Sequence, residues 1–171
     1  MKSIRLAMVG MALAIAVPTS RSFSAIPDSL KNRIDSLQAL ARVSQGLQKY
    51  QAEFKIAWDL FDVDNRIAVN HAGLAYELAV VERDTAKIVR SGRLFGQLLR
   101  RTDKPVEAAA MFHKVLPMAE KLGDQVEVGR ILNALALVYT FQGSSDKALG
   151  AHLKALRLQL TARDTLRAAR T

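Results

Sequence analysis

The sequence predicts an all-α protein built from stacked antiparallel helix pairs, and three observations support this. First, landmarks return at a fixed step of 40 residues, as from Asp84 to Asp124 and Asp164. The same step links apolar positions without gaps: Ala68, Ala108 and Ala148; Ala75, Val115 and Ala155; Tyr76, Leu116 and Leu156; Ala79 and Ala119. Second, helix formers such as Ala, Leu, Arg and Lys dominate, and β-branched residues are scattered among them. Third, there are only four prolines and nine glycines, so little of the chain looks like linker. Repeats of this length indicate stacked helical units.

Composition narrows the possible chemistry. The 171 residues are half hydrophobic and contain no cysteine, which excludes disulfides, thiolate nucleophiles and cysteine-based metal sites. The formal net charge is +9, and the first 25 residues carry three cations and no acid, which leaves +6 on the remainder. This balance favours acidic partners or surfaces without identifying nucleic acid as the ligand.

Residues 1–25 read as a secretory signal peptide. Two cations in Met1–Arg5 precede the apolar run Leu6–Val17, and a small, polar stretch follows. The run is shorter than the roughly 20 residues of a spanning helix. Cleavage after Ser24 or after Ala25 is possible. The first is favoured because it puts Ser22 and Ser24 at the two small-residue positions, whereas the second puts the bulky Phe23 at one of them. The alternatives are an uncleaved N-terminal anchor or a buried first helix. We therefore expect an exported protein with a periplasmic or extracytoplasmic location.

The mature domain, residues 26–171, is expected to begin with three helices. Helical spacing of apolar residues predicts them at about 29–43, 47–61 and 66–82. The segment Asp62-Val63-Asp64-Asn65 separates the second from the third. It resembles the start of a calcium loop, but Arg66 and Ile67 stand where a ligand and the turn glycine belong. We interpret it as a helix junction.

Two further pairs follow in register. We predict helices at 85–101 and 106–122, then at 125–141 and 146–162, with Pro105 at a first helical position and Gly123 as a left-handed C-cap. Pro117 predicts a kink or an early end of its helix. The repeat units are then about 45–83, 84–123 and 124–163.

The last residues repeat the beginning of a unit. Residues 164–171 start with Asp164-Thr165-Leu166-Arg167, as Asp84 and Asp124 start the earlier units. We therefore expect the start of a further unit there, an incomplete terminal helix. This predicts a fragment, a truncated product, or the N-terminal part of a longer array.

The last full unit resembles the tetratricopeptide repeat. That family places bulky, small and aromatic residues on the first helix, a glycine in the turn and two alanines seven apart on the second. Leu132, Leu135, Ala136, Tyr139, Gly143, Ala148 and Ala155 fill those places in order. The preceding unit matches more loosely through Phe95, Gly96, Leu99, Ala108, Phe112 and Val115, with Gly92 where the bulky residue is expected. The resemblance covers about residues 45–171, in a unit of 40 residues against the usual 34.

This resemblance implies a right-handed α-solenoid of about three helix pairs that acts as a non-enzymatic scaffold for protein or peptide partners. The long repeat behind a signal peptide further resembles extracytoplasmic arrays in front of bacterial sensor kinases and regulators. The expected context is therefore the sensory N-terminal part of a longer signalling protein, with membrane contact only through a downstream segment or an uncleaved signal.

In the family the first helices line a concave groove, and their open faces touch the ligand. Carried over by position, this groove would comprise Arg90, Arg93, Gln97, Arg100, Arg130, Asn133 and Thr140. Guanidinium groups bind carboxylates in bidentate fashion, so the partner is expected to carry acidic groups. The simpler interpretation, a solvated basic face, applies to most charged helix faces.

Other residues offer no stronger site. His71, His113 and His152 lie on three different second helices without metal-ligand pairing, and Trp58 falls at core spacing. No phosphate loop and no catalytic constellation is recognisable, so neither a cofactor nor an enzyme is predicted. The alternative function is electrostatic binding of anionic surfaces or nucleic acid, which the signal peptide and the lack of a stacking platform disfavour.

Overall fold

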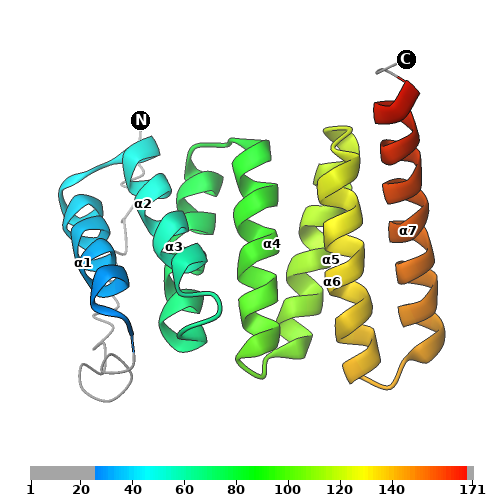
Figure 1. The fold of residues 1–171 in the computed structure, drawn as a ribbon, viewed down its shortest axis with the longest axis horizontal. Helices are drawn as coiled ribbons and strands as arrows, with labels where there is room; N and C mark the ends of the chain where they lie inside the picture. Colours follow the sequence, from blue (N-terminus) through cyan, green and yellow to red (C-terminus); the bar gives the residue numbers. More distant parts are fainter. Residues whose placement is uncertain (1–25, 169–171) are drawn as a thin grey trace, which may run out of the picture.

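The computed structural model describes the backbone of residues 26–168 and the side chains of residues 26–161, so the predicted signal peptide lies outside the described residues. Seven α-helices make up this part (Figure 1). They are α1 Asp28–Val43, α2 Gly46–Asp59, α3 Asn65–Val81, α4 Thr85–Arg101, α5 Pro105–Lys121, α6 Gln125–Phe141 and α7 Ser145–Ala168. The predicted all-α helical repeat fold is confirmed. No helix in the described part is both long and apolar enough to cross a membrane.

The 40-residue repeat in the sequence consists of two equal steps in the structure. Helices α3 to α6 are each 17 residues long. A left-handed backbone conformation occurs in four successive turns, at Arg83 (φ 56°), Asp103 (φ 64°), Gly123 (φ 71°) and Gly143 (φ 71°). Each helix and its turn therefore occupy 20 residues. Glycine is best suited to this conformation, and Gly123 ends α5 as predicted.

Aspartates cap the N-termini of helices α3, α4 and α6. Asp84 accepts a hydrogen bond from the Lys87 backbone N–H at 3.0 Å, and Asp124 accepts the equivalent bond from Glu127 at 3.0 Å. Asp64 caps α3 by accepting from the backbone N–H groups of Arg66 and Ile67. Such caps satisfy amides that have no partner within the helix. They explain the spacing of the aspartates, and they confirm that Asp62–Asn65 is a helix junction.

Small residues let the helices approach closely. The repeated positions Ala68, Ala108, Ala75, Val115 and Ala155 are fully buried. Gly92 stands in the place of a bulky residue because a Cβ there would lie 2.6 Å from Val115 Cγ1 and 3.2 Å from the Tyr76 ring. Neighbouring side chains thus occupy the volume that the larger residue fills elsewhere, and the departure from the family pattern is compensated.

Of the two outcomes predicted for Pro117, a kink or an early end, the early end does not occur. Helix α5 continues to Lys121, in agreement with the predicted range 106–122, because Val115 and Ala119 on either side are fully buried and hold both turns in place. The predicted junction before Asp164 is not present, since α7 continues without interruption to Ala168. Arg83 adopts the left-handed turn conformation where α4 packs on α3. No such helix lies beside the equivalent position 163 in the described part of the chain, and the surrounding residues favour helix.

The helices stack along one axis and form two rows (Figure 1). Each helix packs against its neighbours in sequence, and α4 also touches both α2 and α6. Contacts between alternate helices are thus concentrated in the row α2, α4 and α6. In a curved stack the row whose members lie closest is the inner one. We call α2, α4 and α6 the inner row, and α3, α5 and α7 the outer row.

Candidate binding surface

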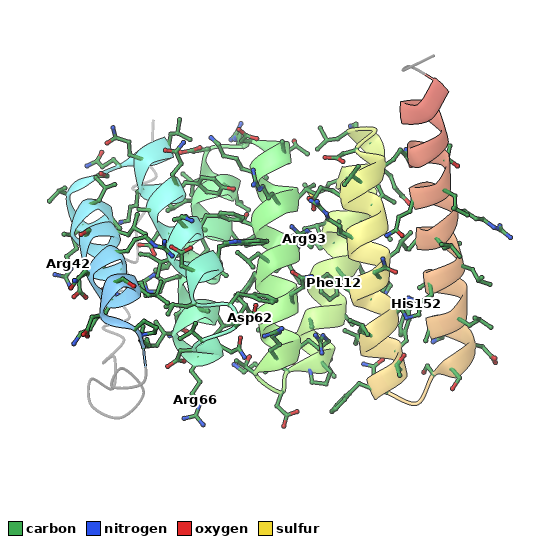
Figure 2. All side chains as sticks on the ribbon, in the orientation of Figure 1. Arg42, Asp62, Arg66, Arg93, Phe112 and His152 are labelled. Atoms are coloured by element: carbon green, nitrogen blue, oxygen red, sulfur yellow. The ribbon has the colours of Figure 1, made fainter. Side chains whose placement is uncertain are left out.

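The predicted ligand residues lie on two neighbouring inner-row helices, α4 and α6, but they are not equally accessible. Arg90 and Arg130 are exposed, as is Thr140, whereas Gln97, Arg100 and Asn133 are half-buried. Arg93 is only 6% exposed and lies between α4 and α6 (Figure 2). The prediction that Arg93 forms part of an open face is therefore wrong, because an acidic residue of the next unit takes up its charge.

That acidic residue is Glu127, at the start of α6. Its Oε2 accepts a hydrogen bond from Arg93 Nε at 2.6 Å, and its Oε1 accepts one from Arg130 Nη1 at 2.7 Å. Arg93 also donates to Gln97 Oε1 at 3.0 Å. Glu127 is 8% exposed, so one buried carboxylate joins two guanidinium groups across the α4–α6 contact. The cluster keeps one net positive charge, and most of that charge is presented by the exposed Arg130.

An aromatic strip on α2 and the turn that follows it continues this surface. The Arg90 guanidinium lies 5.2 Å from the centre of the Phe54 ring, and that of Arg101 lies 4.1 Å from the Phe61 ring. Trp58 stacks on Phe61 at 6.4 Å and is 53% exposed. The sequence interpretation of Trp58 as core packing was therefore wrong. Arg101 also donates to the Phe61 carbonyl at 3.0 Å and pairs with Asp62 at 2.8 Å.

The polar groups predicted on α6 are already engaged within the fold. Asn133 Oδ1 lies 3.2 Å from Nδ1 of His152, which reaches it from α7 (Figure 2). Thr140 Oγ1 donates to the Ala136 carbonyl at 3.0 Å. Leu137 lies between them on the same helix and is exposed. This end of the surface is therefore more apolar than the predicted residues alone suggest.

The histidines connect helices. His71 Nδ1 lies 2.6 Å from Glu53 Oε2, and His113 Nε2 lies 3.1 Å from the Tyr139 hydroxyl. With His152 on Asn133, each histidine links an outer-row helix to an inner-row helix. Within the described residues no group of three or more acidic or histidine side chains could hold a metal ion.

We define the inner surface by its accessible side chains. It runs from an aromatic strip on α2 and the turn after it, through a basic strip on α4, to a mixed strip on α6. The three strips are Phe54, Trp58 and Phe61; Arg90, Gln97, Arg100 and Arg101; and Arg130, Leu137 and Thr140. Flat aromatic rings beside guanidinium groups can bind carboxylates and apolar side chains together. Sequence periodicity located the arginines on α4 and α6 but missed the aromatic strip.

Comparisons with known proteins agree with this architecture. A tetratricopeptide repeat family model matches residues 90–161. No curated protein matches the sequence. The tetratricopeptide repeat domain of Arabidopsis FLU is 22% identical, with a TM-score of 0.63, over 67% of this chain and 97% of that one.

Two other solved structures have the same fold. MamA is 16% identical, with a TM-score of 0.64, over 79% of this chain and 71% of that one. Aspartyl phosphate phosphatase F from Bacillus subtilis is 18% identical, with a TM-score of 0.68, over 79% of this chain but only 36% of the phosphatase. The family model thus identifies tetratricopeptide repeats in residues 90–161, and the three solved structures show that the chain shares their helical-repeat fold.

Proposed function

We propose that this protein is a non-enzymatic scaffold whose inner surface binds a peptide or protein segment carrying both acidic and apolar side chains. The observation that carries the proposal is that accessible Arg90 and Arg130 and exposed Trp58 and Leu137 all lie on the inner-row helices α2, α4 and α6. Guanidinium groups would bind carboxylates of the partner, and the aromatic and leucine side chains would cover its apolar groups. The tetratricopeptide fold supports a scaffold role.

Charge reversal at the two accessible arginines tests this proposal. Peptides would be selected from a random display library on the immobilised chain, and their binding measured by fluorescence anisotropy. Arg90→Glu and Arg130→Glu should each weaken binding by about tenfold or more, equivalent to about 1.4 kcal/mol. Arg93 is not a useful target, because reversing a buried charge beside Glu127 would disturb the fold.

Arg66→Glu is the matched control. Arg66 is an exposed arginine at the start of outer-row helix α3, away from the inner surface (Figure 2), and its reversal changes net charge by the same amount. It should leave peptide affinity within about twofold, the effect expected of a distant, screened charge. Equal losses in all three variants, with a steep decrease in binding as salt is added, would instead favour the alternative of an electrostatic binder of anionic surfaces or nucleic acid.

We also propose that the protein is exported and acts as the sensory N-terminal part of a longer signalling protein. The charged, apolar and small-residue regions of residues 1–25 support export. Expression in a Gram-negative host followed by N-terminal sequencing of the periplasmic fraction tests this. The mature chain should begin at Ala25 or Ile26, and a full-length chain confined to the cytoplasm would contradict it. The reading frame beyond Thr171 tests the signalling context, which a stop codon there would exclude.

A further inference from the structure

A cavity of about 380 Å³ lies between α5, α6 and α7. Three apolar side chains form its floor: Val128 and Leu132 of α6, which are buried, and Leu158 of α7, which is half-buried. None of the residues that define the inner surface lines this cavity. Its volume falls within the range of small-molecule sites, about 300–1,000 Å³. It is therefore a second candidate site, separate from the inner surface.

The preceding unit shows what kind of group fits at this place in the fold. Lys114 and Gly92 stand forty residues before Lys154 and Leu132 of the cavity. The ring of Tyr76 lies between them, 3.2 Å from a Cβ at Gly92 and with the Lys114 ammonium 5.3 Å from its centre. This ring comes from α3, so a side chain of the earlier outer-row helix and not a following helix fills the space. In the next unit a leucine replaces the tyrosine, and Lys154 lies over no ring of the described residues.

Four polar side chains surround the floor. Glu120 lies near the end of α5, Gln125 begins α6, and Lys154 and Arg157 lie on α7. All four are exposed, and within the described residues no side-chain hydrogen bond or ion pair engages any of them. The cavity thus has one carboxylate and two cations at its rim, none of which is neutralised by another. Charged groups of this kind form the stronger hydrogen bonds with charged ligand groups.

The rim charges specify a ligand that carries both signs. A carboxylate alone would face Glu120 without compensation, and an amine alone would leave the cations on α7 without a partner. The lysine above an apolar floor favours an aromatic ring, as the Lys114–Tyr76 contact demonstrates. We propose that the cavity binds a free aromatic α-amino acid. Its carboxylate binds Arg157, its ammonium binds Glu120, and its ring lies on the floor beneath Lys154.

The test uses the full-length chain labelled with nitrogen-15, and L-phenylalanine is the probe. In NMR titrations the backbone amide signals of Gln125, Val128, Leu132 and Leu158 should shift to saturation, and those of the inner surface should not. The analogues 3-phenylpropionate, which lacks the ammonium, and phenethylamine, which lacks the carboxylate, should each bind about tenfold more weakly. That is the usual effect of losing a hydrogen bond to a charged group. L-Alanine, which keeps both charges but has no ring, should also bind more weakly.

Two substitutions at exposed positions assign the ligand's charged groups, and neither is expected to disturb the fold. Arg157→Gln should weaken phenylalanine and 3-phenylpropionate alike, by about tenfold, and leave phenethylamine unchanged. Glu120→Gln should weaken phenylalanine to the level of 3-phenylpropionate and should not weaken 3-phenylpropionate itself. Lys121→Gln is the control, because Lys121 is exposed beside Glu120 but does not line the cavity. It should leave all three affinities within about twofold, as expected of a screened surface charge.

Three results would overturn the proposal. The first is the absence of saturable shifts at the cavity up to the solubility of phenylalanine. The second is equal binding of phenylalanine and its two analogues, which would indicate nonspecific contact with apolar groups. The third is an unchanged phenylalanine affinity in both Arg157→Gln and Glu120→Gln, with saturable shifts on the inner surface instead, which would place the amino acid there.

Discussion

At the scale of single residues, Asp84 stabilises the start of α4 by an amount that depends on pH. Its carboxylate accepts the Lys87 backbone N–H and also pairs with the Lys87 ammonium at 3.2 Å. The backbone hydrogen bond, followed by the side-chain one, lowers the pKa of Asp84 below its ordinary value of 3.8. A carboxyl group with a lower pKa in the folded state stabilises the fold above its unfolded-state pKa. That contribution disappears as pH falls through the folded-state value.

Asp84→Ala should therefore lower the free energy of unfolding by about 1 kcal/mol at neutral pH, the usual effect of losing such a cap. The difference from wild type should shrink as pH falls below about 4, where the unfolded chain binds the proton first, and should vanish below the lowered pKa of the folded state. Thermal unfolding followed by circular dichroism at several pH values measures this. An unchanged difference at low pH would mean that the ionised carboxylate does not contribute.

Two helical glycines are expected to respond oppositely to the same substitution. A Cβ at Gly96 would lie 2.6 Å from Cε1 of the fully buried Phe112 ring (Figure 2), whereas at Gly150 it would meet nothing within 4 Å. Gly96→Ala should destabilise the fold by about 1–3 kcal/mol through overpacking. Gly150→Ala should stabilise it by about 0.5–1 kcal/mol, because glycine is a poor helix former. Urea unfolding measures both, and a neutral Gly96→Ala would show that Phe112 can move aside.

At this scale the sequence predicted the position of a residue on its helix better than its burial or its contacts. It placed Arg90 and Arg93 on the same stripe, three residues apart, but it could not reveal that Glu127 would bury one of them. The pairing joins residues 34 positions apart on two different helices. A repeat pattern predicts where a residue lies on its helix, but it does not predict which residue it contacts. Trp58 was missed for a related reason, since helical spacing does not distinguish a covered face from an open one.

At the scale of helices, the Arg93–Glu127 pair ties α4 to α6. Removing one partner of a buried ion pair leaves an uncompensated charge. Glu127→Ala should therefore lower the free energy of unfolding by about 3 kcal/mol, as measured in urea. The control is Asp62→Ala, which removes an exposed partner of Arg101 and should cost less than about 1 kcal/mol.

A double variant separates the cost of the charge from the loss of contact. Arg93→Met combined with Glu127→Leu should regain most of the stability lost in Glu127→Ala, because apolar residues of similar volume can replace a buried pair. If the double variant were less stable than the single one, the hydrogen bonds of Arg93 and not its charge would hold the two helices together.

Helix boundaries were predicted best where local chemistry fixes both ends. The predicted ranges 85–101 and 125–141 coincide with α4 and α6, because an aspartate cap begins each helix and a tight turn follows it. An early helix end at Pro117 and a junction before Asp164 do not occur, because packing decides both. The buried residues Val115 and Ala119 keep α5 helical on both sides of Pro117. Helix α7 continues past residue 163, where the described residues include no following helix that would stabilise a turn.

At the scale of the whole molecule, the 40-residue repeat was sufficient to predict a stack of helix pairs. It was not sufficient to predict the composition of the inner surface, because that surface combines three helices whose open faces differ. Aromatic residues dominate on α2, arginines on α4 and a mixture on α6. A repeat predicts what its units share, whereas a binding surface depends on where they differ.

The close packing of Gly92 against Tyr76 has a consequence for whether such a chain can lose or gain a repeat unit. Forty residues on, the same two positions are Leu132 and Leu116, a pair of medium-sized residues in place of a small and a large one. A chain that lost residues 84–123 would keep its register but would bring Leu132 onto Tyr76, where even the Cβ of an alanine would lie 3.2 Å from the ring. The two units that meet at Gly92 and Tyr76 are therefore matched in volume, and a unit with leucine at the glycine position does not fit there without rearrangement.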